Sequence, residues 1–196
     1  MGITIGLVLF DGAEELDWAG PFEVFTMARR PGDTVVTIAE RDGPVTGAKG
    51  LRVLPDHTFE TAPALDVVLI PGGQGSRVER TNPAMLDFVR RVAPGCTWVT
   101  SVCTGAFVLE AAGLVAGKRV TTHWGAIEEL RALAPEQEIL EHVRYVRDGN
   151  VVTSAGVSAG IDMALWLVGQ LVSVEHARMT QYAMEYDPAP PYAGLV

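Results

Sequence analysis

Short apolar runs alternate along the chain with longer segments in which apolar residues recur at helical spacing. Runs that are apolar at nearly every position are typical of strands buried on both faces of a parallel sheet. Such strands are predicted at residues 3–10, 34–39, 66–70, 96–101 and 119–122. Helices are predicted at residues 17–29, 82–92, 104–112, 124–133, 158–172 and 174–186. The helix at 158–172 is apolar on nearly every side, so we expect it to be buried.

Turn residues add two hairpins to this pattern. Asp148 and Gly149 join two predicted strands at 144–147 and 151–154, and Asp-Gly is a typical hairpin turn. The glycine-punctuated segment 43–54 predicts a second, smaller hairpin. Strands interleaved with helices indicate one doubly wound α/β domain over residues 1–196, with a mostly parallel sheet and helices on both faces.

Doubly wound sheets bind their ligands beyond the carboxyl ends of the strands. That edge of the predicted sheet carries four loops. They are residues 11–17, 71–75, 101–105 and 155–158. We therefore expect the functional residues there.

Charge and cysteine content restrict the classes of function. The chain has 15 Lys and Arg and 24 Asp and Glu, a net charge of −9, so we expect no nucleic-acid partner. It opens on an apolar strand with no basic segment before it, and no apolar run is long enough to span a bilayer. We therefore expect neither a secretory signal nor a membrane segment. Two cysteines do not make a disulfide framework, which indicates reduced thiols and a cytoplasmic location.

Cys103 lies between a predicted strand and a predicted helix with almost no loop, the context of a nucleophile elbow. So tight a turn needs small residues two positions before and after the nucleophile, and Ser101 and Gly105 meet that need. The N-terminal amides of the helix, Thr104 among them, are expected to lower the thiol pKa. The alternative is a cysteine that is only part of the core. Cys96 has no such surroundings and is expected to be structural.

The other loops of that edge offer partners for the sulfur. Asp17 is a candidate acid, or alternatively the N-cap of the helix that follows it. Gly72 and Gly73 let backbone amides approach a ligand closely, or form an ordinary turn. His123 follows a strand and is a candidate for catalysis or for a structural role. The histidines and cysteines lack the short spacings of a zinc site, so we expect no metal.

Several segments together resemble the ThiJ/PfpI superfamily over essentially the full chain. They are residues 5–10, 16–21 (Leu-Asp-Trp-Ala-Gly-Pro), 68–73 (Val-Leu-Ile-Pro-Gly-Gly), 101–105 (Ser-Val-Cys-Thr-Gly), 121–124 (Thr-Thr-His-Trp) and 160–162. The resemblance implies a flavodoxin-like fold of the class I glutamine amidotransferase type. Thr104, the Leu-Asp-x-x-Gly-Pro segment and the Pro-Ala-Pro-Pro-Tyr-Ala-Gly tail look most like bacterial isocyanide hydratases.

Departures from other branches narrow what the resemblance implies. Protease-like relatives place His after the cysteine, where this chain has Thr104, and glutaminase relatives use a late His-x-Glu, whereas His176 is followed by Ala and Arg. Glyoxalase-like relatives typically place Glu in the first loop, where this chain has Asp17. Peptidase and glutaminase activity are therefore not expected, and glyoxalase or deglycase activity ranks second.

The resemblance implies hydration of a small neutral isocyanide to an N-formamide. Cys103 would attack the isocyanide carbon and form a thioimidate, and Asp17 would deliver the proton, with Thr104 as a third catalytic residue. Gly72, Gly73, Trp124 and Val157 would bind the substrate. No cofactor is expected, and close relatives imply a homodimer. Two alternatives stay open: a glyoxalase- or deglycase-like enzyme acting on 2-oxoaldehydes, and a non-catalytic module in which Cys103 senses oxidants or a ligand.

Overall fold

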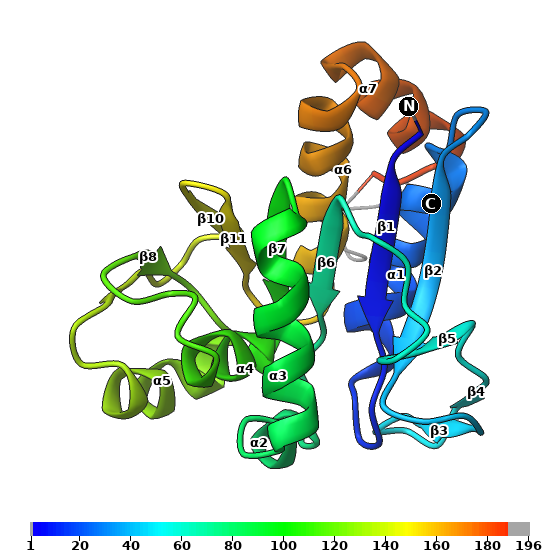
Figure 1. The fold of residues 1–196 in the computed structure, drawn as a ribbon. Helices are drawn as coiled ribbons and strands as arrows, with labels where there is room; N and C mark the ends of the chain where they lie inside the picture. The colour runs from blue at the N-terminus through cyan, green and yellow to red at the C-terminus, as the bar shows by residue number, and fades with distance from the viewer. Residues whose placement is uncertain (1, 188–196) are drawn as a thin grey trace.

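The computed structural model describes residues 2–187, built around a seven-stranded sheet (Figure 1). Its strands are, in spatial order, β10 (Tyr145–Asp148), β11 (Val151–Ser154), β7 (Trp98–Val102), β6 (Val67–Ile70), β1 (Thr4–Val8), β2 (Thr34–Ala39) and β5 (His57–Thr58). Only β10 and β11 pair antiparallel; every other neighbouring pair in this sheet is parallel. The predicted mostly parallel sheet is confirmed.

Helices cover both faces of the sheet, as predicted. One face carries α1 (Glu15–Met27) and α6 (Ala159–Leu171), with α7 (Val174–Ala183) packed on them. The opposite face carries α3 (Pro83–Val92) and α4 (Ala106–Ala111), which pack on each other in front of the sheet in Figure 1. The short α2 (Ser76–Glu79) and α5 (Ile127–Leu133) lie next to α4.

The core fills the space between the sheet and these helices. Every residue of β6 and β7 is buried, which explains why neither sequence alternates between apolar and charged positions. The two polar residues of β7, Thr100 and Ser101, are buried as well. Leu7, Leu69, Phe107 and Met163 are fully inaccessible to solvent, and each such side chain contributes about 1.5–3 kcal/mol by leaving water. The strands that position the functional loops are therefore firmly held.

Several predicted elements are corrected by the structure. The strand predicted at 119–122 is only β8 (Arg119–Val120), which pairs with the unpredicted β9 (Glu138–Ile139) outside the main sheet. It cannot extend a ladder on β11, because the Thr121 N–H donates to the Thr153 hydroxyl at 2.8 Å. One side of α6 is only partly covered, at Leu165 and Trp166, so the prediction of a helix buried all round was wrong.

The two hairpins predicted from turn residues are both present in the structure. The predicted hairpin at 43–54 is confirmed as β3 (Val45–Thr46) paired antiparallel with β4 (Arg52–Val53). The hairpin at Asp148–Gly149 is confirmed as β10 and β11. No helix within residues 2–187 is long and apolar enough to cross a membrane. The proline-rich tail singled out in the sequence, residues 188–194, lies outside the described residues.

Backbone hydrogen bonds join the four predicted loops at the carboxyl edge of the sheet. Glu14 N donates to Gly72 O at 2.9 Å and so links the first loop to the second. Cys103 N donates to Ala155 O at 3.3 Å and links the third to the fourth. The chain therefore builds one continuous rim of loops around Cys103.

Candidate active site

Cys103 directly follows β7 and begins a 3₁₀ turn, Cys103–Gly105, that leads into α4. Its φ is +55°, a left-handed conformation that is strained for a residue with a side chain. A Cβ at Gly105 would lie 2.1 Å from Ile70 O, so the requirement for a small residue there is confirmed. The predicted helix begins only at Ala106, because the turn occupies the residues before it.

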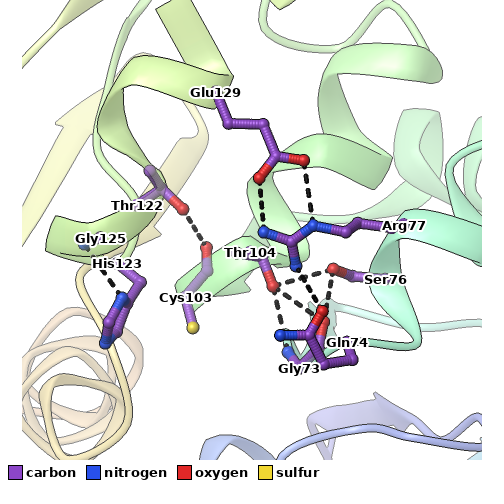
Figure 2. A network of polar contacts seen from close by, with 10 residues as sticks. All are labelled: Gly73, Gln74, Ser76, Arg77, Cys103, Thr104, Thr122, His123, Gly125 and Glu129. Carbon is purple, nitrogen blue, oxygen red and sulfur yellow. Dashed lines mark hydrogen bonds and ion pairs between the residues drawn. The ribbon is translucent and has the colours of Figure 1, made fainter.

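The backbone of Cys103 is fixed at both ends of its peptide unit. Besides the bond from its N–H to Ala155 O, its carbonyl accepts a hydrogen bond from the Thr122 hydroxyl at 2.8 Å (Figure 2). Thr122 is buried. These contacts hold the strained conformation in place.

Asp17 lies on α1, close to Cys103. Its carboxyl group is completely buried, and Oδ2 accepts the Gly72 N–H at 2.8 Å. The N-cap of α1 is Glu14, so the alternative that Asp17 only caps its helix is wrong. Oδ1 is buried and has no hydrogen-bond partner among the described residues. A buried carboxyl oxygen without a partner costs free energy and calls for an explanation.

Burial raises the pKa of Asp17 to about 7, against the opposing effect of the Gly72 N–H. The negative charge of Glu14 raises it further, whereas the Cys103 thiol and the Val157 N–H favour the carboxylate. Among the described residues, neither of these two groups makes a hydrogen bond of good geometry to the Asp17 carboxyl group. Asp17 therefore titrates in the physiological range.

Burial also raises the pKa of the Cys103 thiol, to about 12, and the charge of Asp17 adds to this shift. The Thr104 amide and hydroxyl and the Gly73 N–H act in the opposite direction. The sequence-based expectation of a lowered thiol pKa is thus wrong in sign. The amides act as predicted, but desolvation of a nearly inaccessible sulfur outweighs them.

The two shifts together make the groups a coupled pair. Between the two pKa values, about 7 and about 12, Cys103 and Asp17 hold one proton between them. A thiol with so high a pKa does not ionise freely at neutral pH, so it needs an adjacent acceptor. The carboxylate of Asp17 is placed to be that acceptor, and a thiol beside a base can form the reactive sulfur anion when substrate arrives.

Gly72 and Gly73 are required by close contacts. A Cβ at Gly72 would lie 2.4 Å from Thr104 N, and Gly73 has φ +105° with Glu14 N and Gly12 O each 2.4 Å from where a Cβ would be. The two amides do not point into open space, since Gly72 N donates to Asp17 and Gly73 N donates to Thr104 Oγ1 at 3.0 Å. The glycines therefore position the acid and the hydroxyl of the site.

Sequence reasoning missed Ser76, which is fully buried beside Thr104. Its Oγ lies 2.8 Å from Thr104 Oγ1 and 2.8 Å from Gly73 O (Figure 2). Its place just after the Gly72–Gly73 loop was the only available signal, and a serine at the start of a short helix is usually a cap.

A cavity of about 240 Å³ lies beside the Cys103 turn. It is lined by Thr121, Thr122, His123, Trp124, Ile127, Glu141, His142, Val143, Arg144, Ala155 and Gly156. His123 Nδ1 accepts the Gly125 N–H at 3.1 Å, so the ring proton is on Nε2 when His123 is neutral. Trp124 is 82% exposed on the rim, its ring 5.4 Å from that of His123.

Val157 does not line this cavity. It lies in the loop after β11, with φ +53°, a rare conformation for a β-branched residue. Its N–H acts on Asp17. Val157 thus lies close to Asp17, and Trp124 lies at the cavity that the neighbouring Gly156 also lines. Within residues 2–187, no cluster of three or more His, Cys, Asp and Glu side chains could hold a metal ion.

Known proteins share this chain's sequence and fold. Residues 4–170 match the DJ-1/PfpI family. The chain is 45% identical over 193 residues to an isonitrile hydratase from Pseudomonas putida, covering 98% of this chain and 82% of that protein. It is 32% identical over 177 residues to the Parkinson disease protein 7 homolog of Danio rerio, covering 87% and 90% respectively.

A solved structure has the same fold. The crystal structure of a ThiJ/PfpI family protein from Pseudomonas syringae superimposes with a TM-score of 0.91 at 33% identity, covering 98% of this chain and 78% of that one. The resemblance predicted from the Cys103 elbow and its companion segments is confirmed. This chain belongs to the DJ-1/PfpI family.

Proposed function

We propose that this chain hydrates small, neutral isonitriles (isocyanides) to N-formamides through a covalent intermediate on Cys103. One observation carries the proposal: the buried Cys103 thiol lies beside the buried Asp17 carboxyl group, whose Oδ2 is held by the Gly72 N–H and whose Oδ1 has no hydrogen-bond partner among the described residues. The likeness to the isonitrile hydratase of Pseudomonas putida supports it. Adding a thiol to a neutral carbon needs one nucleophile and one proton carrier.

In the first step the Cys103 sulfur bonds to the terminal carbon of R–N≡C. The thiol proton passes to the Asp17 carboxylate and from there to the same carbon, which gives the thioimidate R–N=CH–S–Cys103. No net charge enters or leaves the site in this step. The burial that raises the pKa of both groups therefore does not oppose the reaction.

In the second step water adds to the thioimidate carbon. Asp17 takes a proton from the water and delivers one to the nitrogen. The resulting R–NH–CH(OH)–S–Cys103 then breaks its C–S bond, the hydroxyl proton returns to the sulfur through Asp17, and R–NH–CHO leaves. The Thr104 hydroxyl and the Gly73 N–H, which already lower the thiol pKa, stabilise the departing sulfur.

Trp124 and Val157 are proposed as walls of the substrate site, with Gly72 and Gly73 at its base. A neutral substrate is selected mainly by shape. The cavity of about 240 Å³ contributes Trp124 to this site, and neither Cys103 nor Val157 lines it. The proposed reaction uses no metal and no cofactor. Replacing Val157 by Phe should raise KM for branched isonitriles.

We also propose a single domain that acts in the cytoplasm as a homodimer. Nine large hydrophobic side chains are exposed within residues 2–187, Trp124 and Tyr182 the most, and a second copy would cover part of that surface. Light scattering that gives the monomer mass at micromolar concentration would overturn the dimer.

The decisive experiment incubates the purified protein with an alkyl isonitrile and, separately, with methylglyoxal. NMR of the products distinguishes formamide from lactate. Formamide that depends on Cys103 supports the proposal, whereas lactate as the only product would assign a glyoxalase-like function. Turnover of neither substrate, with stoichiometric oxidation of Cys103 by peroxide, would instead indicate a redox-sensing module.

A further inference from the structure

Ser76 is a buried polar residue that the proposed reaction does not use. It is fully inaccessible to solvent and begins α2, 28 residues before Thr104 in the chain. Its hydroxyl lies 2.8 Å from the Thr104 hydroxyl and 2.8 Å from the Gly73 carbonyl (Figure 2). A hydroxyl that is buried between two polar groups has a defined set of possible partners.

The Thr104 hydroxyl has one proton and more than one possible hydrogen-bond acceptor for it. It accepts the Gly73 N–H at 3.0 Å, so one of its lone pairs is occupied. Its proton reaches the Gly73 carbonyl at 3.1 Å. The same hydroxyl lies beside the Cys103 side chain, since a Cβ on Gly72 would be 2.7 Å from Thr104 Oγ1 and 2.8 Å from Cys103 Cβ. From there it lowers the pKa of the thiol. One proton cannot serve the carbonyl and the sulfur at the same time.

The Gly73 carbonyl would lose a good donor if the Thr104 proton turned to the sulfur. It would keep the Ser76 N–H, which donates to it at 3.2 Å. The Ser76 hydroxyl is closer, at 2.8 Å, and it can turn from Thr104 Oγ1 to this carbonyl by rotating its O–H bond. Both arrangements then leave every buried group with a partner.

We infer that Ser76 is a positioning residue, whose hydroxyl takes over the Gly73 carbonyl when the Thr104 proton turns to the sulfur of Cys103. In the resting site Ser76 donates to Thr104 and Thr104 donates to Gly73 O. When the sulfur becomes negative, Thr104 donates to the sulfur and Ser76 donates to Gly73 O. No bond to carbon changes and no proton leaves its oxygen.

This inference rests on the proposed role of Cys103 as the reactive thiol, but it does not depend on the substrate. Without the Ser76 hydroxyl, the Gly73 carbonyl keeps only the backbone N–H of residue 76 as a donor whenever the sulfur is charged. The charged sulfur is then formed less often, and the cost of one buried hydrogen bond corresponds to about a tenfold effect.

The test measures the rate at which iodoacetamide modifies Cys103, followed by mass spectrometry of the Cys103 peptide, from pH 5 to 10. In Ser76→Ala we expect the rate above pH 7 to fall about tenfold, with the midpoint of the pH profile unchanged because Asp17 is untouched. Ser76→Thr keeps a hydroxyl and should restore most of the rate. Isonitrile turnover is not needed for this readout, so the proposed function can fail while this inference stands.

Two further variants separate positioning from a general structural role. Thr104→Val removes the group through which Ser76 acts, so adding Ser76→Ala to it should cause no further loss of rate. Thr100→Val removes another fully buried hydroxyl, which donates to Val68 O at 2.9 Å, and should affect stability but not the profile. An unchanged rate in Ser76→Ala, or a tenfold loss that persists in the Thr104→Val background, would overturn the inference.

Discussion

Cys96 and Cys103 have the same burial and different surroundings. Each side chain keeps 7% of its surface exposed, and neither forms a disulfide. Burial raises the pKa of Cys96 to about 11 and that of Cys103 to about 12. By its pKa alone, Cys96 would be the more reactive thiol.

The difference lies in what each sulfur contacts. Cys96 donates to the Val92 carbonyl at 3.4 Å, a group that cannot take its proton. Cys103 has the Asp17 carboxyl group beside it, with a pKa of about 7 and one oxygen free of hydrogen bonds within residues 2–187. Under the proposed mechanism, the comparison means that a buried thiol becomes a nucleophile through its proton acceptor rather than through its own pKa.

The largest expected effect separates the two cysteines directly. Cys103→Ala should abolish formamide production, because no other group supplies the covalent step. Cys96→Ala should keep the rate within a factor of about two and lower the melting temperature by a few degrees, as expected for a small cavity. Steady-state kinetics and calorimetry on both variants make this test. Equal loss of activity in the two would remove the distinction between them.

Asp17→Asn should reduce kcat by about 10²–10⁴-fold, because the amide keeps the size of the side chain but cannot transfer a proton. Folding should not suffer. The folded-state pKa of Asp17 is raised above its ordinary value, so the ionised group costs stability that is absent at low pH and grows as the pH rises to about 7. The variant should therefore be at least as stable as the parent at pH 8.

Urea unfolding of the parent and of Asp17→Asn at pH 5 and pH 8 checks the predicted stability of the variant. A full-rate Asp17→Asn enzyme would show that another group carries the proton, and His123 would be the next candidate. A strongly destabilised variant would mean that the carboxylate is structural after all.

The smallest effect concerns simple chemical reactivity at neutral pH. Iodoacetamide should modify Cys103 faster than Cys96 by about tenfold, in spite of the higher pKa of Cys103. The Asp17 carboxyl group interacts directly with the Cys103 thiol, whereas Asp66 only raises the pKa of Cys96 through its charge. Peptide mapping after mild labelling measures the ratio. Preferential modification of Cys96 would show that the thiol pKa alone governs reactivity.

Much of this site could be predicted from sequence because it depends on topology. Parallel strands bring their carboxyl ends to one edge, and that rule alone places Asp17 near Cys103, although 85 residues separate them. The small residue at Gly105 follows from the tight turn, and the structure shows the contact with Ile70 O that requires it.

The rest depends on burial, which a local pattern does not report. The direction of the Cys103 pKa shift was predicted wrongly because the helix amides are visible in the sequence and the degree of desolvation is not. Ser76 was missed because it lies in the four-residue α2, too short to show a periodic pattern. The strand β5 was not predicted for the same reason: with only two residues, its sequence can show no alternation.

The central claim is that Cys103 and Asp17 share one proton, and the pH dependence of Cys103 alkylation tests it most directly. In the parent protein the rate should rise through pH 7, as the Asp17 carboxyl group loses its proton and becomes able to accept that of the thiol. In Asp17→Asn this rise should disappear, and the rate should stay low until the thiol ionises by itself at high pH. A parent profile already at its plateau below pH 6, and unchanged by Asp17→Asn, would mean that Cys103 is a free thiolate and would contradict the account.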